Sequence, residues 1–227
     1  MQNISELIIG IKHKGKFEIL DSWGKIVDKV ISDNQYFDVN YFPNISGTYT
    51  TERMLFNNDT GNYLKVTAHD IIYRHKLETE DYELEYKKFC ERVIKNLVPN
   101  IINDYAVGKF IRIGIVFNIK LDKNNQYSKL IQNVMNPKIQ NVNDIRFSKK
   151  EATGKGKLFS ENNDYINKIY TMSIKEDNTP SLIYDYQYYF NPIQEDFRQC
   201  NLESLFKSSK DSMENDIKFL LGEINEK

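Results

Sequence analysis

The residue types that carry most enzyme chemistry are few in this 227-residue sequence, which has only three histidines and two cysteines. His69-Asp70 has the composition of a metal-binding pair, but a metal site needs further ligands. The other two histidines, His13 and His75, also lie in strand-like segments. We interpret His69-Asp70 as part of a turn, and the sequence predicts no metal site.

The other motifs of catalysis are also missing from the sequence. Cys90 and Cys200 have no CxxC partner and no base beside them, so we expect small buried hydrophobic residues rather than nucleophiles. Segment 154–157 (Gly-Lys-Gly-Lys) lacks the leading strand and the first glycine of a phosphate-binding loop, which favours a flexible basic loop. Glu52 or Asp185 could serve a nuclease of the Asp…Glu-x-Lys type, although the Glu-x-Lys continuation is missing. We predict no catalytic residues and no cofactor.

A basic segment at residues 146–157 is the first candidate for binding. Residues 121–157 hold eight lysines and arginines against three acidic residues, whereas residues 158–227 hold seven against thirteen. Such a segment can contact phosphates, and the protein would then be a nucleic-acid-binding protein or a metal-dependent nuclease. The alternative is an ordinary solvated loop. The lysines of this candidate site are Lys149, Lys150, Lys155 and Lys157.

A tyrosine-rich strand is the second candidate for binding. The chain has 15 tyrosines, and alternation along residues 184–190 places Tyr184, Tyr186 and Tyr188 on one face. These rings could stack on the bases of a single-stranded nucleic acid or contribute to a protein-binding surface. Asp185 and the acidic C-terminal part of the chain would repel a polyanion. The alternative is that the same rings pack against the closing helix.

A strand at residues 110–121 is the element expected to organise the fold, because its alternation is the clearest in the chain. Successive side chains of a strand point to opposite faces, so this pattern predicts a half-buried central strand. The apolar face would carry Ile111, Ile113, Ile115, Phe117, Ile119 and Leu121. The opposite face would carry Arg112, Gly114, Val116, Asn118 and Lys120.

Strands and helices follow one another in two similar series along the chain. Strand-like runs joined by short turns come first and are typical of an antiparallel meander. A long helix at residues 80–98 is predicted next, because apolar residues recur every three or four positions there. Further strand signals then lead to a closing helix at residues 202–224, which Asn201 would cap.

These elements predict an α+β protein with antiparallel sheets, each covered by a long helix. We expect two sub-domains that share the central strand at 110–121. The first would span residues 1–121 and include the helix at 80–98. The second, smaller and β-rich, would span residues 122–227 and be closed by the helix at 202–224.

The chain resembles a sporadically distributed family of uncharacterised bacterial proteins. In that family the junction between helix and strand carries an Arg-x-Gly followed by an aromatic residue, which Arg112, Gly114 and Phe117 match. The sequence departs from the family at Val116, where a second arginine is usual. The resemblance implies the fold, a bacterial origin and an association with anti-phage systems, but no known activity. It rests on residues 55–61 with Leu64 and Val66, on the helix 82–98 leading into 111–114, and on 184–186.

The leading functional expectation is a non-catalytic protein that binds another protein as a component of a bacterial anti-phage defence module, with a homo-oligomer as a further form. The missing catalytic motifs, the tyrosine content and sheet edges suited to strand addition favour this function. No apolar run reaches the roughly 18–20 residues that span a bilayer. The N-terminus also lacks the pattern of a signal peptide. We therefore expect a cytoplasmic protein without a membrane partner.

Overall fold

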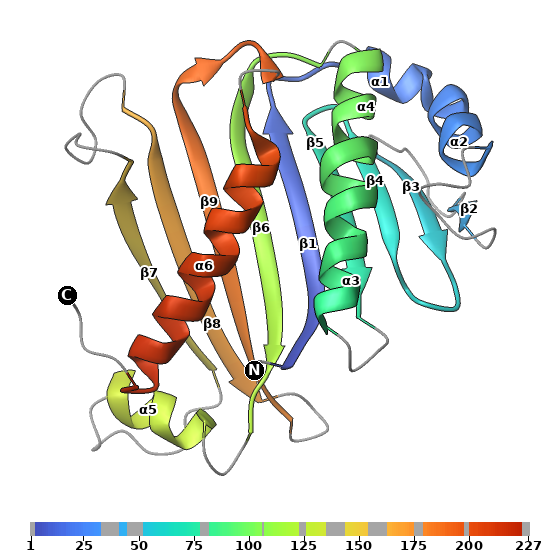
Figure 1. Cartoon of the computed structure of the whole chain (residues 1–227). Coiled ribbons are helices and arrows are strands. Elements are labelled where there is room, and N and C mark those ends of the chain that lie inside the picture. Colours follow the sequence, from blue (N-terminus) through green and yellow to red (C-terminus); the bar gives the residue numbers. More distant parts are fainter. Residues whose placement is uncertain are drawn as a thin grey trace.

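In the part of the chain that the structure describes, nine strands form one antiparallel sheet (Figure 1). The computed structural model describes residues 3–32, 41–44, 52–77, 82–105, 107–122, 126–134, 144–153, 163–174, 179–197 and 200–223. Strands from both halves of the chain join in this sheet, so its core is shared along the whole sequence.

The first half of the chain contributes five strands and five helical segments. The strands are β1 (Asn3–His13), β2 (Tyr41–Asn44), β3 (Glu52–Asn57), β4 (Tyr63–Thr67) and β5 (Asp70–Lys76). Two helices, α1 (Glu18–Asp21) and α2 (Trp23–Ser32), follow β1. A continuous helix follows β5, in three segments: α3 (Tyr82–Phe89), the π-helical η1 (Cys90–Leu97) and α4 (Val98–Asp104).

The second half contributes four strands and two helices. The strands are β6 (Phe110–Lys120), β7 (Asp144–Ala152), β8 (Tyr165–Ile174) and β9 (Pro180–Gln194). The helices are α5 (Ser128–Val134), which precedes β7, and α6 (Leu202–Leu220), which closes the chain. The cap predicted for α6 is confirmed, because the Asn201 side chain accepts a hydrogen bond of 2.8 Å from the Ser204 amide.

The two halves of the chain have the same topology. The strand order is β2-β3-β4-β5-β1-β6-β9-β8-β7. From the middle of the sheet outward, the first half of the chain contributes β1, β5, β4 and β3. The second half contributes β6, β9, β8 and β7 in the same arrangement. In each half, a long helix follows the last strand in the sequence. Gly10 of β1 lies directly opposite Gly114 of β6. The first strands of the two halves thus pair and join them into one sheet.

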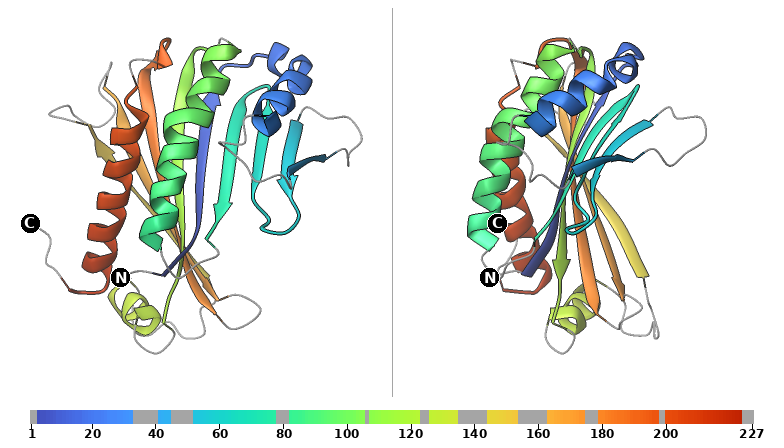
Figure 2. Two further views of the ribbon diagram at one scale, coloured as in Figure 1. Left: turned by 45° about the vertical axis from the view of Figure 1, so that its right-hand side comes forward. Right: turned by 90° about the vertical axis from the view of Figure 1, so that its right-hand side faces the viewer.

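The two long helices lie on the same face of the sheet (Figures 1 and 2). Strand alternation directs the large apolar side chains to this face, where they leave the solvent. Ile9 of β1 is 1% exposed, and its cross-strand neighbour Ile115 of β6 is fully buried. The core is therefore the layer between the sheet and the two helices.

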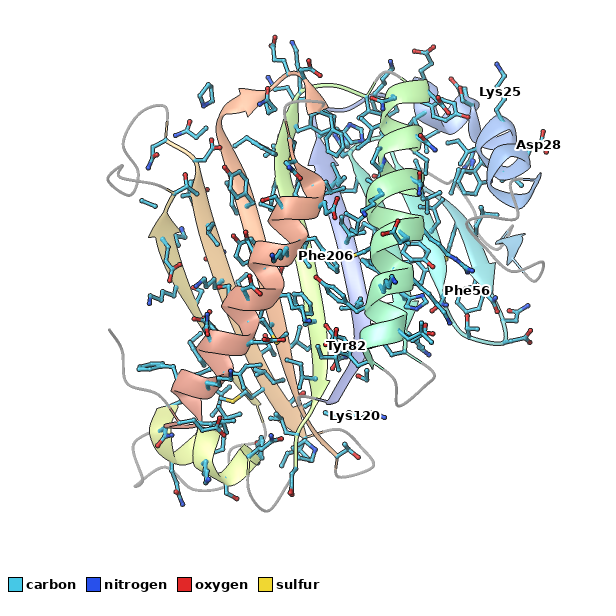
Figure 3. All side chains as sticks on the ribbon, viewed as in Figure 1. Lys25, Asp28, Phe56, Tyr82, Lys120 and Phe206 are labelled. Carbon is cyan, nitrogen blue, oxygen red and sulfur yellow. The ribbon has the colours of Figure 1, made fainter. Side chains whose placement is uncertain are left out.

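Aromatic side chains connect the two long helices to each other and to the sheet. Phe206 of α6 points toward the α3 helix (Figure 3) and stacks on Tyr86, with 5.0 Å between ring centroids. It also packs on Phe89 at 5.2 Å and on Phe117 of β6 at 6.2 Å. Pairs of this geometry stabilise a core beyond the area they bury. Within the described ranges, no helix is both long and apolar enough to cross a membrane.

The second face of the sheet, called the open face below, carries no helix in the part of the chain that the structure describes (Figure 2). In the edge-on view the strands at both edges lean away from the helices, which makes the open face concave. Cross-strand pairing assigns to it Glu6, Ile8, Gly10 and Lys12 of β1, Ile72 and Arg74 of β5, and Tyr63 and Lys65 of β4. The second half contributes Arg112, Gly114, Val116, Asn118 and Lys120 of β6, Ile183, Asp185, Gln187 and Tyr189 of β9, Tyr165, Asn167, Ile169 and Thr171 of β8, and Arg146, Ser148 and Lys150 of β7.

The predicted fold class is wrong. We expected an α+β protein with two sheets, each covered by its own long helix, that share the strand at 110–121. The structure instead has one large antiparallel sheet that continues across the expected boundary between 1–121 and 122–227, and both long helices lie on the same face of it. The physical reason is that β1 offers hydrogen-bonding groups on both of its edges, and it pairs with β5 on one side and with β6 on the other.

Candidate functional site

The lysines of the predicted basic site lie only partly within the described residues. Lys149 and Lys150 are exposed on β7, the edge strand of the sheet. Lys149 forms an ion pair of 3.3 Å with Glu151, and Lys150 lies on the open face opposite Asn167. Lys155 and Lys157 lie outside the described residues.

The tyrosines of the predicted stacking surface face the helices. Tyr184 is fully buried and Tyr186 is 3% exposed, so their rings belong to the core and are not available to a ligand. Tyr188 is half-buried, and its hydroxyl donates a 2.6 Å hydrogen bond to Asp164. The alternative interpretation, packing against the closing helix, therefore holds for Tyr184, whose hydroxyl donates to Asp216 of α6 at 2.8 Å.

In the part of the chain that the structure describes, the two nuclease candidates are not brought together and neither cysteine is activated. Burial raises the pKa of Cys90 and of Cys200 to about 11, so both thiols stay protonated at neutral pH. Glu52 lies on β3 and Asp185 on β9, with four strands between them in the sheet. His13 is fully buried, and desolvation lowers its pKa. In the described part of the chain, no group of three or more histidines, cysteines and carboxylates is placed to hold a metal ion.

A buried charged cluster lies under α6. The Lys168 ammonium lies 2.9 Å from a carboxylate oxygen of Glu151 and 3.1 Å from one of Asp216. The hydroxyls of Tyr170 and Tyr184 both donate to the same Asp216 oxygen at 2.8 Å. Burial raises the pKa of both tyrosines far above its usual range, so both remain neutral donors. Because these contacts satisfy the charges, we assign the cluster to holding α6 on the sheet.

The open face has an apolar centre. In an antiparallel sheet with one solvated face, the side chains of that face are normally polar. Here half-buried aliphatic side chains occupy the middle of the face without joining the core cluster. They are Ile8, Ile72, Val116, Ile169 and Ile183. Beside them Gly10 and Gly114 lie opposite each other; Gly10 is half-buried and Gly114 is buried.

A chain of hydrogen bonds crosses the second half of the open face. Arg112 of β6 donates from Nη1 to the Tyr189 hydroxyl of β9 at 3.4 Å, and that hydroxyl donates to Gln187 Oε1 at 3.0 Å. Asn167 of β8 donates to the same Gln187 oxygen at 3.3 Å. The Gln187 amide in turn donates to Asp185 at 2.6 Å. These contacts fix polar side chains of three neighbouring strands in one arrangement.

Asp185 is held in the open face at a cost to stability. Burial raises the pKa of its carboxyl, and the hydrogen bond from Gln187 and the nearby Arg112 and Arg146 only partly offset this. The ionised form is therefore less favourable in the folded state than in the unfolded state. The loss of stability is complete at pH values above the pKa of Asp185 in the folded protein. It vanishes below about pH 4, where Asp185 is protonated in both the folded and the unfolded state.

Replacement of Asp185 by asparagine is therefore expected to raise the melting temperature at neutral pH. An asparagine keeps an oxygen that can accept from Gln187 but carries no charge to desolvate. The difference from wild type should shrink as the pH falls and disappear below about pH 4. Thermal unfolding of both proteins across this range is the measurement. A lower melting temperature for Asp185→Asn at neutral pH would contradict the assigned cost.

The two halves of the open face differ in how well their polar groups are paired. In the first half, Arg74 forms an ion pair with the buried carboxylate of Glu6 and lies 5.6 Å from the Tyr63 ring centroid. In the second half, three polar atoms are buried without a hydrogen-bond partner among the described residues: Nε of Arg112, Oδ1 of Asn118 and Oδ1 of Asn167. Unpaired buried groups are costly, so the second half is the candidate for contact with a ligand or partner.

Sequence reasoning identified the residues of this face on β6 but not their importance. The alternation at 110–121 separates Arg112, Gly114, Val116 and Asn118 from the apolar residues, and this set was expected to face solvent. The presence of Gly114 and Val116 among these polar residues was the signal that this face is not an ordinary solvated one.

Comparison of the chain with protein-family models gives no match, and comparison with curated proteins finds no similar sequence.

Proposed function

We propose that this protein is a non-catalytic binding protein that holds another protein against the open face of its sheet. The observation that carries the proposal is the apolar centre of this face, where half-buried aliphatic side chains such as Val116 and Ile169 lie outside the core. An apolar centre with a polar rim is the usual anatomy of a protein–protein interface. A role in a bacterial anti-phage defence module rests on the family resemblance and is part of the same proposal.

The test compares two double variants by affinity purification from the native host. Val116→Gln/Ile169→Gln replaces the apolar centre by polar side chains without a change of charge. Leu84→Gln/Phe219→Gln makes the same change at two exposed residues of the helical layer, which are 47% and 42% exposed. We expect wild type and the helical variant to recover the same stoichiometric partner, and the open-face variant to lose it.

Two further measurements make the purification decisive. Both variants should melt close to wild type, since each replaces side chains that remain in contact with solvent. The recovered partner, once purified, should slow amide hydrogen exchange in β1 and β6 when mixed with the wild-type protein. If no stoichiometric protein is recovered and the pure sample hydrolyses a nucleotide or nucleic acid, the proposal is wrong.

Nucleic-acid binding at the basic edge is the second candidate function. The observation that favours it is the run of exposed cations on β7, Arg146, Lys149 and Lys150. The ion pair of Lys149 with Glu151 and the presence of Asp185 on the open face weigh against it. Phosphate contacts by these cations would make binding strongly dependent on salt.

A further inference from the structure

Arg112 is a half-buried cation of the open face. No carboxylate among the described residues lies within ion-pair distance of its guanidinium, and its Nε is buried without a hydrogen bond. Its hydrogen bond to the Tyr189 hydroxyl is long at 3.4 Å. The guanidinium carbon lies 5.8 Å from the centroid of the same ring. A partly desolvated charge in this state gains a great deal from a suitable acceptor.

The neighbours of Arg112 hold it in place. Tyr189 stacks on Tyr165 of the next strand, with 4.7 Å between ring centroids and 5° between the planes. The Tyr189 hydroxyl is also fixed by its hydrogen bond to Gln187. The guanidinium therefore packs against a rigid aromatic surface. A partner would meet a preorganised group and lose little side-chain entropy in binding it.

Charge around Arg112 favours an acidic partner. Lys12 lies directly opposite Arg112 on β1 and is exposed, and Lys120 is exposed at the other end of β6. Arg146 and Lys150 are exposed on the same face of β7. Asp185, with its raised pKa, is the half-buried carboxyl among them. This half of the open face thus presents more positive than negative charge, which steers and selects an acidic surface.

We infer that Arg112 binds a carboxylate of the partner, so that the partner is a protein segment carrying an aspartate, a glutamate or a free C-terminus. The inference rests on the proposed function, since it names the chemistry of the same open face. A planar guanidinium accommodates a carboxylate with two parallel hydrogen bonds.

A protein partner fits this face better than a nucleic acid. At its centre Ile8 and Val116 lie side by side, and Ile169 follows beyond Asp185 in the same cross-strand row, whereas stacking of bases requires exposed aromatic rings there. An acidic peptide can bury apolar side chains on the row and place one carboxylate on Arg112.

Peptide selection on the purified full chain tests the inference. A phage-displayed library of random peptides is selected on wild type, and synthetic copies of the enriched peptides are titrated by fluorescence anisotropy. We expect the peptides to share an acidic residue whose replacement by the matching amide weakens binding to wild type by roughly 30-fold or more. Against Arg112→Gln, the acidic peptide and its amide should bind equally.

Lys12→Gln is the matched control, because it removes the same charge from the residue directly opposite. An exposed charge contributes little, so this variant should weaken binding by about threefold or less. Arg112→Lys, which keeps the charge but not the planar fork, should lose most of the preference for the acidic peptide. Melting curves of all variants establish that they are folded.

The other outcomes separate the inference from the proposed function. Suppose that Val116→Gln/Ile169→Gln abolishes peptide binding, but the acidic peptide binds no better than its amide, or still binds better to Arg112→Gln. The inference about Arg112 is then wrong, and the proposed function stands. If no selected peptide depends on Val116 and Ile169, the proposed function fails as well. Binding of an oligonucleotide that Arg112→Gln removes would replace both with nucleic-acid recognition.

Discussion

Replacement of Ile9 by aspartate is expected to unfold the protein at room temperature. Ile9 is 1% exposed on the central strand β1, between the sheet and the helices. The change removes a buried aliphatic side chain and places an unpaired carboxylate in its position, for a combined loss of about 5 kcal/mol or more. Total stabilities of domains are only about 5–15 kcal/mol. Circular dichroism and denaturant titration measure the effect.

The neighbouring isoleucine provides the control, with the same substitution on the opposite face. Ile8 is half-buried on the open face, directly opposite Arg74 of β5. An aspartate there stays in contact with solvent and faces a cation, so Ile8→Asp should cost about 1–2 kcal/mol. If the two variants lose similar stability, the open face is covered and our assignment of the two faces is wrong.

Replacement of Asp216 by alanine should produce the second large loss, about 3 kcal/mol of unfolding free energy. The change removes an acceptor from two tyrosine hydroxyls, of which that of Tyr184 keeps Ser212, and deprives the Lys168 ammonium of one of its two carboxylates. The side chain of Lys168 is 7% exposed, so water cannot replace the lost partner. Denaturant titration of the variant gives the free energy.

A second substitution shows whether the buried charge causes that loss. Adding Lys168→Met to Asp216→Ala removes the uncompensated ammonium and should recover part of the stability, so that the two changes are not additive. Asp211→Asn, on an exposed residue of the same helix, should change the stability by less than about 0.5 kcal/mol. A purely additive result would show that Lys168 does not depend on Asp216.

Local features of the fold could be predicted from the sequence because they depend on neighbouring residues. The alternation identifies β6 and both of its faces from Arg112 onward, since the period of a strand is a property of its own sequence. The cap of α6 could be predicted for the same reason: the Asn201 side-chain oxygen accepts from the amide of Ser204, only three residues away. Ile111, predicted on the apolar face, is half-buried outside the core, because the register shifts between Phe110 and Arg112. The tyrosines of β9 could be located on one face, but not assigned to core or surface.

The pairing of distant strands could not be predicted in this way. Alternation shows that a strand has an apolar face, but it carries no record of which strand pairs with it. The pairing of β1 with β6 brings Gly10 opposite Gly114, and nothing near either glycine in the sequence specifies the other. The unpaired state of Arg112 depends on β8 and β9 as well, so the candidate site became visible only once the sheet was assembled.

The central place of β1 has a consequence for the synthesis of the chain. β1 is synthesised well before its second neighbour, β6, which is complete only after residue 120 has left the ribosome. Until then an isoleucine-rich strand has one free edge, and such edges are templates for pairing with other chains. Non-local pairing of this kind also slows folding, because a long loop must close before the contact forms. A nascent chain that stalls before β6 is therefore prone to aggregate, and the rate of translation through this region bears on the yield of folded protein.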